Sequence, residues 1–293
     1  MGTLYVVATP IGNLEDITLR ALRILREVSL IAAEDTRETR KLLSRHGIVT
    51  PATSYFEHSK LSKLEAILAR LQTGDVALVS DAGTPGISDP GYELVRAAID
   101  AGHPVVPVPG PSAVVAALAV SGLPTDQFVY FGFLPRRSSD RRRFLAAAAA
   151  DRRTLVAYES PHRLLGALED VRATLGNRRV AIATELTKLF EEVFRGTVSD
   201  AIEWVGVSRP RGEYTLVIAG ANAEAPALDA EVEEEVRRLA GEGYPTREVV
   251  ERVAGATGRS RREVYRLLLR VAASPEAPGE GAAGQDEVGH GKI

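Results

Sequence analysis

The 293-residue chain contains no cysteine, which excludes disulfide bonds, thiol catalysis and cysteine-ligated zinc or iron–sulfur sites. Its five histidines are scattered, with no two of them four residues apart, so we expect no metal site. No apolar run approaches the roughly 20 residues that cross a bilayer, and the first residues do not have the pattern of a signal peptide. We therefore expect a cytoplasmic protein with no membrane partner.

Aromatic residues make up only 5% of the chain, and lysine accounts for only five of the 36 basic residues. The rest of the composition is that of a globular protein, with 45% hydrophobic and 26% charged residues. It excludes a largely disordered or fibrous chain, and the length suits two domains better than one. The net charge of −3 is not typical of a whole-chain nucleic-acid binder, so any such surface must be local.

Apolar runs alternate with amphipathic segments in the first third of the chain. Short strands are predicted at 4–9, 30–34, 76–80 and 104–108. Helices are predicted to open at Asp16, at Thr36, at a Ser62–Glu65 capping box, at Asp89 followed by Pro90, and at Ser112. This alternation predicts an α/β domain with a mostly parallel sheet over 1–115.

A second α/β domain is predicted over 116–222. Its strand candidates are 128–133, 154–159, 180–186 and 214–219, and its clearest helix follows the N-cap Ser160 and ends at Gly176. The segment 191–197 has the pattern of a hairpin strand, which predicts a mixed sheet.

The C-terminal part has a different pattern. Beyond a linker at 221–228, three short helical segments with glycine-bearing turns predict a helix-turn-helix-like module over 229–272. The glycine- and proline-rich residues 273–293 cannot form a core, so we expect a disordered tail.

The most informative stretch is Ser80-Asp-Ala-Gly-Thr-Pro-Gly-Ile-Ser-Asp-Pro-Gly91, which follows a predicted central strand. Ligands of open α/β sheets bind at such strand ends, and glycines let the backbone approach a ligand closely. The alternative interpretation is an elaborate strand-to-helix turn. Asp81 favours a ligand site, because a carboxylate at a strand end is costly unless it meets a partner.

Two other loops follow predicted strands. In Pro109-Gly-Pro-Ser-Ala113, Ser112 is either a helix N-cap or a ligand contact. Thr9-Pro-Ile-Gly12 occupies the place of a dinucleotide-binding loop but lacks the G-x-G-x-x-G pattern, and the chain has no P-loop motif. Dinucleotide binding and P-loop phosphoryl transfer are therefore disfavoured.

Several motifs occur together in this chain. They are Thr9-Pro-Ile-Gly-Asn-Leu14, Glu34-Asp-Thr-Arg37, the glycine-rich stretch 80–91, Pro109-Gly-Pro-Ser-Ala113, Tyr158-Glu-Ser-Pro-His162, Thr184-Glu-Leu-Thr-Lys188 and Gly212-Glu-Tyr-Thr215. With this combination, residues 3–272 resemble the RsmI group of small-subunit ribosomal RNA methyltransferases, within the tetrapyrrole methylase superfamily. The resemblance implies two α/β domains with a cofactor cleft between them, a small C-terminal helical domain and a homodimer.

The resemblance also implies an activity. It is the 2′-O-methylation of a cytidine ribose in the decoding region of 16S rRNA, with S-adenosylmethionine as methyl donor and the small ribosomal subunit, assembled as the 30S particle, as partner. Carried over position by position, the resemblance implies these cofactor contacts: Pro10, Asp81, Gly83, Ile87, Ser112, Ala113, Glu159 and Thr184. The first loop carries less glycine than is usual in the superfamily.

A ribose hydroxyl is a poor nucleophile until it loses its proton, so a general base within hydrogen-bond reach is expected. The catalytic candidates, which the sequence does not rank, are Glu34, Asp35, Glu159, Glu185 and Lys188. Lys188 could instead hold an RNA phosphate. Each of the five is equally consistent with membership of an ordinary salt bridge.

Arginines cluster in two places. One cluster is predicted to lie in a loop between the α/β domains and contains Arg136, Arg137, Arg141, Arg142 and Arg143; the last predicted helix carries Arg261, Arg262 and Arg266. Guanidinium groups pair with phosphates and stack on unpaired bases, which favours RNA binding at both places. The alternative is a solvated surface in a chain whose basic residues are mostly arginine.

Two other functions remain open at this point. One is a methyltransferase of the same superfamily that acts on a porphyrinoid or a protein side chain. The other is a non-catalytic helix-turn-helix regulator that binds DNA through 229–272. Arginines beside the cleft favour RNA over a porphyrinoid, and binding of S-adenosylmethionine would separate an enzyme from a regulator.

Overall fold

The computed structural model describes residues 1–55, 60–207, 212–221, 230–257 and 261–273. It divides into two compact units, Met1–Asn222 and Ala223–Ile293, which are described separately below. Within the described ranges, no helix is long and apolar enough to span a bilayer.

The first half of the larger unit is built on a parallel five-stranded sheet. Its order is β3 (Ala52–Ser54), β2 (Leu30–Ala33), β4 (Val76–Val79), β1 (Leu4–Val7) and β5 (Val105–Val108). All four residues of β4 are buried, as expected of a parallel sheet covered on both faces. The predicted parallel sheet is confirmed, and the short edge strand β3 is an addition to the prediction.

Helices cover both faces of this sheet. Side chains of α1 (Leu19–Glu27) and α2 (Thr36–Arg45) pack with Ala77 and Val79 of β4. Side chains of α3 (Lys60–Leu71) and α4 (Tyr92–Asp100) pack with Val76 and Leu78 of the same strand. Alternate residues of one strand therefore serve two separate cores, which holds the loops at the strand ends in place.

Three of the predicted helix starts are wrong. Helix α1 begins at Leu19 after the N-cap Thr18, and Asp16 ends a separate short 3-10 turn. Helix α3 begins at Lys60, so Ser62 lies inside its first turn and is not the N-cap. Helix α4 begins at Tyr92, and its N-cap is Gly91, whose φ of 149° is one that favours glycine. The chain from Gly83 to Pro90 is therefore a loop, and Asp89 does not cap the helix.

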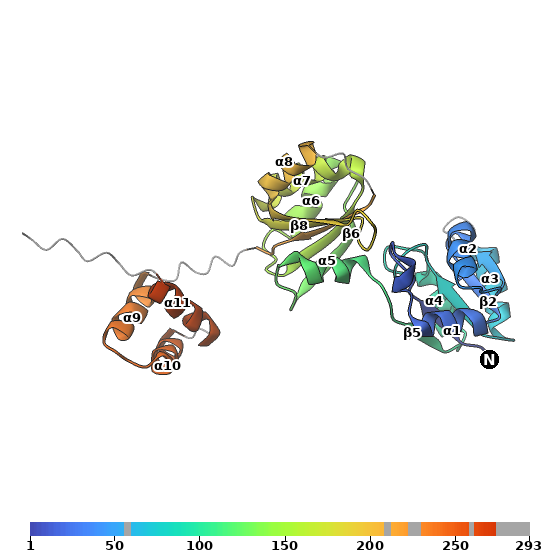
Figure 1. Ribbon diagram of the computed structural model, residues 1–293, viewed down its shortest axis with the longest axis horizontal. Coiled ribbons are helices and arrows are strands. Elements are labelled where there is room, and N and C mark those ends of the chain that lie inside the picture. Colours follow the sequence, from blue (N-terminus) through green and yellow to red (C-terminus); the bar gives the residue numbers. More distant parts are fainter. Residues whose placement is uncertain (56–59, 208–211, 222–229, 258–260, 274–293) are drawn as a thin grey trace, which may run out of the picture. The chain divides into compact units, whose positions relative to one another are not determined.

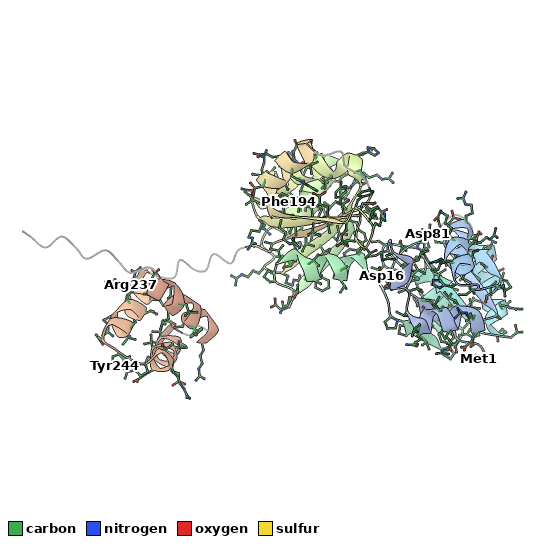
Figure 2. The ribbon with its side chains drawn as sticks, viewed as in Figure 1. Met1, Asp16, Asp81, Phe194, Arg237 and Tyr244 are labelled. Carbon is green, nitrogen blue, oxygen red and sulfur yellow. The ribbon has the colours of Figure 1, made fainter. Side chains whose placement is uncertain are left out.

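The second half of this unit has a mixed sheet, as predicted. Its order is β6 (Phe128–Phe133), β7 (Thr154–Glu159), β10 (Tyr214–Ile218), β8 (Arg179–Thr184) and β9 (Glu192–Thr197). The β6–β7 pair is parallel and the other pairs are antiparallel. Phe194 of β9, which Figure 2 labels, stacks on another ring of this half. The partner is Trp204, with 5.1 Å between ring centroids.

Three helices cover one face of the second sheet, α6 (Ser138–Ala147), α7 (Pro161–Leu175) and α8 (Val198–Val207). The other face is covered by α5 (Ala113–Ser121) (Figure 1). Because α5 packs on the second sheet, a domain boundary at residue 115 would cut through this helix. The first half therefore ends before Ala113.

The smaller unit contains three helices, α9 (Ala230–Gly241), α10 (Thr246–Thr257) and α11 (Arg261–Ala273). Valine and leucine side chains from all three form one core, so the three predicted helices are confirmed. The predicted tail after residue 273 and most of the predicted linker lie outside the described residues.

Candidate functional site

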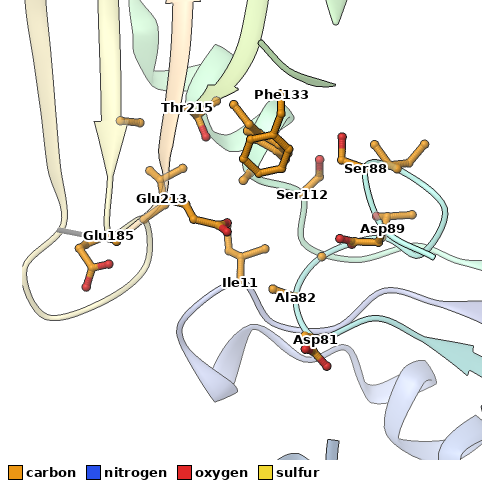
Figure 3. Close-up of a pocket in the computed structure, with 18 of the residues that line it drawn as sticks. Ile11, Asp81, Ala82, Ser88, Asp89, Ser112, Phe133, Glu185, Glu213 and Thr215 are labelled. Atoms are coloured by element: carbon orange, nitrogen blue, oxygen red, sulfur yellow. The ribbon is translucent and has the colours of Figure 1, made fainter. Parts of the chain in front are cut away.

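A pocket of about 410 Å³ lies at the carboxyl ends of the first sheet's strands (Figure 3). The first half lines it with loops after β1, β2, β4 and β5, which place Ile11, Glu34, Asp81 and Ser112 there. The second half lines it with side chains that include Phe133 and Glu213. The connection after β1 runs to β2 on one side, whereas the connection after its neighbour β4 runs to β5 on the other side, and such a switch point is where α/β sheets bind ligands.

The glycine-rich loop 81–91 forms one wall of the pocket and is held at two places. Near its start, the N–H groups of Thr9 and Gly83 each donate to the other's carbonyl, at 2.8 and 3.0 Å. Further along, Ser88 shares a hydrogen bond of 2.6 Å with the Tyr130 hydroxyl of β6. Ser88 has a φ of 63°, an unfavourable value for a non-glycine residue. Backbone strain of this kind is found where surrounding contacts over-determine a functional loop.

The first loop touches the second half at Gly12. A Cβ atom at this position would lie 2.6 Å from Cγ of Lys188 and 2.7 Å from the Leu186 carbonyl oxygen. Both of these residues line the pocket. The loop after β1 and the loop after β8 therefore close one side of the pocket at a point where no side chain fits.

The pocket is strongly acidic. Its lining includes five carboxylates, from Glu34, Asp81, Asp89, Glu185 and Glu213. Lys188 is the one cationic side chain among the described residues of the lining, and its Nζ lies 2.9 Å from Oε1 of Glu185. The pocket as a whole is therefore suited to a ligand that carries positive charge.

Three of these carboxyl groups, those of Glu34, Asp81 and Asp89, lie close enough to influence one another's charge. The Asp81 N–H donates to Glu34 at 3.2 Å, and the Asp35 N–H donates to Asp81 at 3.0 Å. Partial burial raises the pKa of Glu34 and of Asp81, and neighbouring carboxylates raise both further. Burial, followed by the charge of Glu34, raises the pKa of Asp89 to about 7. A cationic ligand would offset this repulsion.

Comparison with known proteins identifies the family. Residues 3–202 match the model described as Tetrapyrrole (Corrin/Porphyrin) Methylases. A Synechocystis protein named Ribosomal RNA small subunit methyltransferase I is 47% identical over 277 residues, which cover 93% of this chain and 99% of that protein. The chain belongs to the RsmI group of the tetrapyrrole methylases.

Another member of the group differs in length. The Thermotoga maritima protein of the same name is 51% identical over 221 residues, which cover 99% of that protein but only 75% of this chain. Its length is therefore close to that of the larger unit alone. Among solved structures, a crystal structure of diphthine synthase superposes with a TM-score of 0.60 at 14% identity, covering 74% of this chain and 90% of that one, which shows a shared fold.

The structure of this tetrapyrrole methylase brings most of the expected site residues together. Lining the pocket are Glu34, Asp81, Gly83, Ile87, Ser112, Ala113, Glu185 and Lys188. Pro10 lines a neighbouring hollow of about 120 Å³, which also includes Thr39 and Asp81. Thr184 is buried at the end of β8 and is not part of the lining.

Two of the proposed bases do not reach the pocket. Glu159 is fully buried, accepts a hydrogen bond from the Ser160 N–H at 2.8 Å and pairs with Arg163 at 3.0 Å. Asp35 caps α2 by accepting from the Arg37 N–H and also pairs with the Arg37 guanidinium, which lowers the pKa of Asp35 to about 2. Both carboxylates have structural partners and neither lines the pocket, so the structure does not bring them together with the other predicted site residues.

Two lining carboxylates are absent from the site predicted by sequence. Asp89 has the pattern of a helix cap because proline follows it, although it stands inside the most informative motif. Glu213 belongs to the Gly212-Glu-Tyr-Thr215 motif, which by itself assigns it no role. Figure 3 shows Glu213 reaching from the second half toward Ile11, opposite Asp81 and Asp89.

The first arginine cluster lies partly in a loop and partly in a helix. Arg136 and Arg137 precede α6, as predicted, whereas Arg141, Arg142 and Arg143 lie within it, so the predicted loop is wrong for these three. Arg141 is 5% exposed, and its guanidinium pairs with the buried Asp170 at 2.6 Å and donates to the Gly166 carbonyl at 3.2 Å. Arg141 is therefore a structural residue and not an RNA contact. Arg142 also pairs with Asp170 but is half-exposed.

The remaining arginines differ in their surroundings. Arg136, Arg137 and Arg143 are exposed at or near the start of α6. Arg261 is exposed at the start of α11, whereas the side chains of Arg262 and Arg266 lie outside the described ones.

Among the described residues, no group of three histidine, aspartate or glutamate side chains could hold a metal ion.

Proposed function

We propose that this protein transfers a methyl group from S-adenosylmethionine to the 2′ oxygen of a cytidine ribose in the decoding region of 16S rRNA. The observation that carries the cofactor assignment is the acidic pocket, in which five carboxylates face one lysine. The rRNA assignment is supported by relatives named Ribosomal RNA small subunit methyltransferase I, which match nearly the whole chain.

The lining suits this cofactor chemically. S-adenosylmethionine carries a sulfonium and an ammonium group, and the crowded Glu34, Asp81 and Asp89 supply the opposite charge. Ile87 and Phe133 add apolar surface for its adenine ring. When bound, the cofactor supplies a methyl group that is already activated as an electrophile. The protein must then position the acceptor, exclude water and accept one proton.

We assign the proton acceptor to Asp89. Of the other lining groups, Glu34 accepts the Asp81 N–H, Asp81 accepts the Asp35 N–H, and Glu185 and Lys188 pair with each other, which leaves Asp89 and Glu213. No cationic side chain in the described part of the chain pairs with Asp89, and its pKa of about 7 falls when a cation binds, so the group is then a carboxylate that can accept a proton. Lys188 pairs with Glu185 but is 43% exposed, and we assign it to a phosphate of the acceptor strand.

We propose two separate RNA-binding segments, Arg136, Arg137 and Arg143 in the larger unit and the arginine-rich sequence of α11 in the smaller unit. The first three follow β6, whose last residue, Phe133, lines the pocket.

We also propose a cytoplasmic homodimer. The dimer is supported by the exposed Val115 and Val120 on α5, a helix with no charged residue. Light scattering on wild type and on Val115→Asp tests the dimer, which the charged variant should weaken.

The test of function is methyl transfer to purified 30S subunits lacking the modification, with labelled S-adenosylmethionine. We expect label at one cytidine and resistance of the adjoining phosphodiester to alkali, because a 2′-O-methyl group blocks that cleavage. Label on protein or on an added porphyrinoid would favour the rival methyltransferases. Failure to bind S-adenosylmethionine would favour a non-catalytic regulator.

A further inference from the structure

The smaller unit has a hollow of its own, between α10 and α11. Its volume is about 540 Å³, and it is lined by Thr246, Arg247, Val250, Glu251, Arg261 and Tyr265. Val250 is buried, whereas the Tyr265 ring is 46% exposed. The volume falls within the roughly 300–1,000 Å³ of sites that take small organic groups. We call this site the Tyr265 hollow.

Both arginines of the Tyr265 hollow are loosely held. Nε of Arg247 lies 3.5 Å from Oε1 of Glu251, and Nη2 of Arg261 lies 3.9 Å from the same oxygen. Their side chains are 90% and 75% exposed. Exposed pairs of this kind contribute about 0–1 kcal/mol, so a phosphate could replace Glu251 as the partner of either arginine at little cost.

The charge of the sequence around the hollow points to an anion. Helix α11 and the residues just before it contain Arg259, Arg261, Arg262, Arg266 and Arg270 against a single acidic residue, Glu263. This basic segment also supplies Tyr265. The unit already contains an arginine placed over an aromatic ring, since the Arg252 guanidinium lies 4.4 Å from the centroid of Tyr244. Figure 2 labels Tyr244.

We propose that the Tyr265 hollow binds one unpaired base of the RNA substrate. The base stacks on the Tyr265 ring, and Arg247 and Arg261 contact the phosphates on either side. An exposed aromatic ring flanked by arginines recognises bases in single-stranded RNA, because stacking requires a base that is not already paired. The inference rests on the proposed function, since it takes RNA as the substrate.

The hollow is therefore an anchoring site at a distance along the chain from the catalytic residues. Every residue placed in the catalytic pocket lies within the larger unit, whereas this site belongs wholly to the smaller one. It would add affinity for RNA and leave cofactor binding unchanged. The Thermotoga relative, with a length close to that of the larger unit, indicates that such an anchor is an addition to the methylase core.

The test uses the full chain and fluorescence anisotropy with a labelled single-stranded RNA. Three probes are compared: the strand alone, the same strand paired with its complement, and a strand with abasic positions. Tyr265→Ala should raise the Kd for the single strand roughly fivefold to a hundredfold, and Tyr265→Phe should keep wild-type affinity. Leu269→Ala is the matched control, because Leu269 is 51% exposed on the same helix but does not line the hollow.

A second comparison tests the two arginines. The logarithm of the RNA-binding constant falls linearly with the logarithm of the salt concentration. In the Arg247→Ala, Arg261→Ala double variant, this fall should be less steep, by about 0.7 in slope for each phosphate that the protein no longer neutralises. For the abasic strand, Tyr265→Ala and wild type should bind equally. Wild-type affinity of Tyr265→Ala for the single strand, or equal binding of single strand and duplex by the wild type, would overturn the inference.

The two proposals fail in different ways. If the wild type methylates 30S subunits while Tyr265→Ala binds RNA normally, only the Tyr265 hollow is wrong. If the wild type neither methylates 30S subunits nor binds RNA, the proposed function is wrong and the inference fails with it. A thermal melt of each variant shows that the three-helix core remains folded.

Discussion

Ser88 and Tyr130 share a 2.6 Å hydrogen bond that joins the glycine-rich loop of the first half to the first strand of the second. Tyr130 also packs edge-on against Tyr158, which lines the pocket. The bond holds a serine with a positive φ in place. It therefore connects the wall of the pocket, across the cleft, to the sheet on the other side.

We expect Tyr130→Phe to weaken cofactor binding by roughly fivefold, because a single hydrogen bond contributes about 1 kcal/mol. The ring remains, so the melting temperature should change little. Calorimetry with S-adenosylmethionine measures the affinity, and Tyr92→Phe, an exposed tyrosine on α4, is the control. Equal affinity of Tyr130→Phe and wild type would show that the loop keeps its position without this bond.

Asp89 should make the protein less stable as the pH rises from about 4 to 7. Its pKa is near 4 in the unfolded chain and about 7 in the folded protein, so the folded state binds more protons in this window. Stability falls with pH wherever the folded state binds the extra proton. Thermal melts across this range should show a flatter profile for Asp89→Asn than for wild type. Parallel profiles would contradict the raised pKa.

Binding of S-adenosylmethionine should release protons between pH 6 and 7. A cation in the acidic pocket lowers the pKa of Asp89, so the proton held there is lost on binding. Calorimetry in buffers with different ionisation enthalpies measures the number released. Asp89→Asn should bind with no such buffer dependence, and a release unchanged in this variant would place the proton on another group.

Arg141→Ala should change the stability of the protein, and Arg143→Ala should change its RNA binding. Removing Arg141 leaves Asp170 buried with only Arg142 as its ionic partner, and we expect a loss of about 3 kcal/mol, at the low end for breaking a buried pair. Arg143 is 82% exposed, so its removal should leave stability unchanged and reduce the salt dependence of RNA binding. Urea unfolding and salt titrations of RNA affinity separate the two effects.

Ending the chain after Asn222 should leave a folded protein that binds S-adenosylmethionine normally. The last strand of the second sheet, β10, is retained, and every pocket-lining residue precedes the cut. Affinity for 30S subunits should fall, because the arginines of α11 are removed. If the shortened protein melts cooperatively but no longer binds the cofactor, the smaller unit must contribute to the catalytic site.

Much of this architecture could be predicted from local patterns. Buried runs such as Val76–Val79 and cap residues such as Ser112 mark their elements in the sequence itself. Helix α5 shows the limit of such patterns. It is apolar on every face, so nothing in its own residues indicates that it packs on the second sheet instead of the first.

The errors at the site also have physical causes. Arg141 lies 29 residues from Asp170, the partner that buries it, and no local pattern shows such a contact. Asp89 has the sequence of a helix cap, but Gly91 takes that position and leaves the carboxylate to the pocket. For Glu159, by contrast, a signal was present, since Arg163 follows it four residues later.

The contact at Gly12 has a consequence for how the pocket can change. On that side of the pocket, the main-chain atoms of Gly12 in the first half contact Lys188 and Leu186 of the second half directly. Even one methyl group at position 12 would collide with both residues, so this contact sets the spacing between the two halves there. Any larger residue there would act as a wedge that widens the entrance. In this chain, an acceptor of another size would then have to be accommodated at other lining positions, such as Ile11 and Phe133.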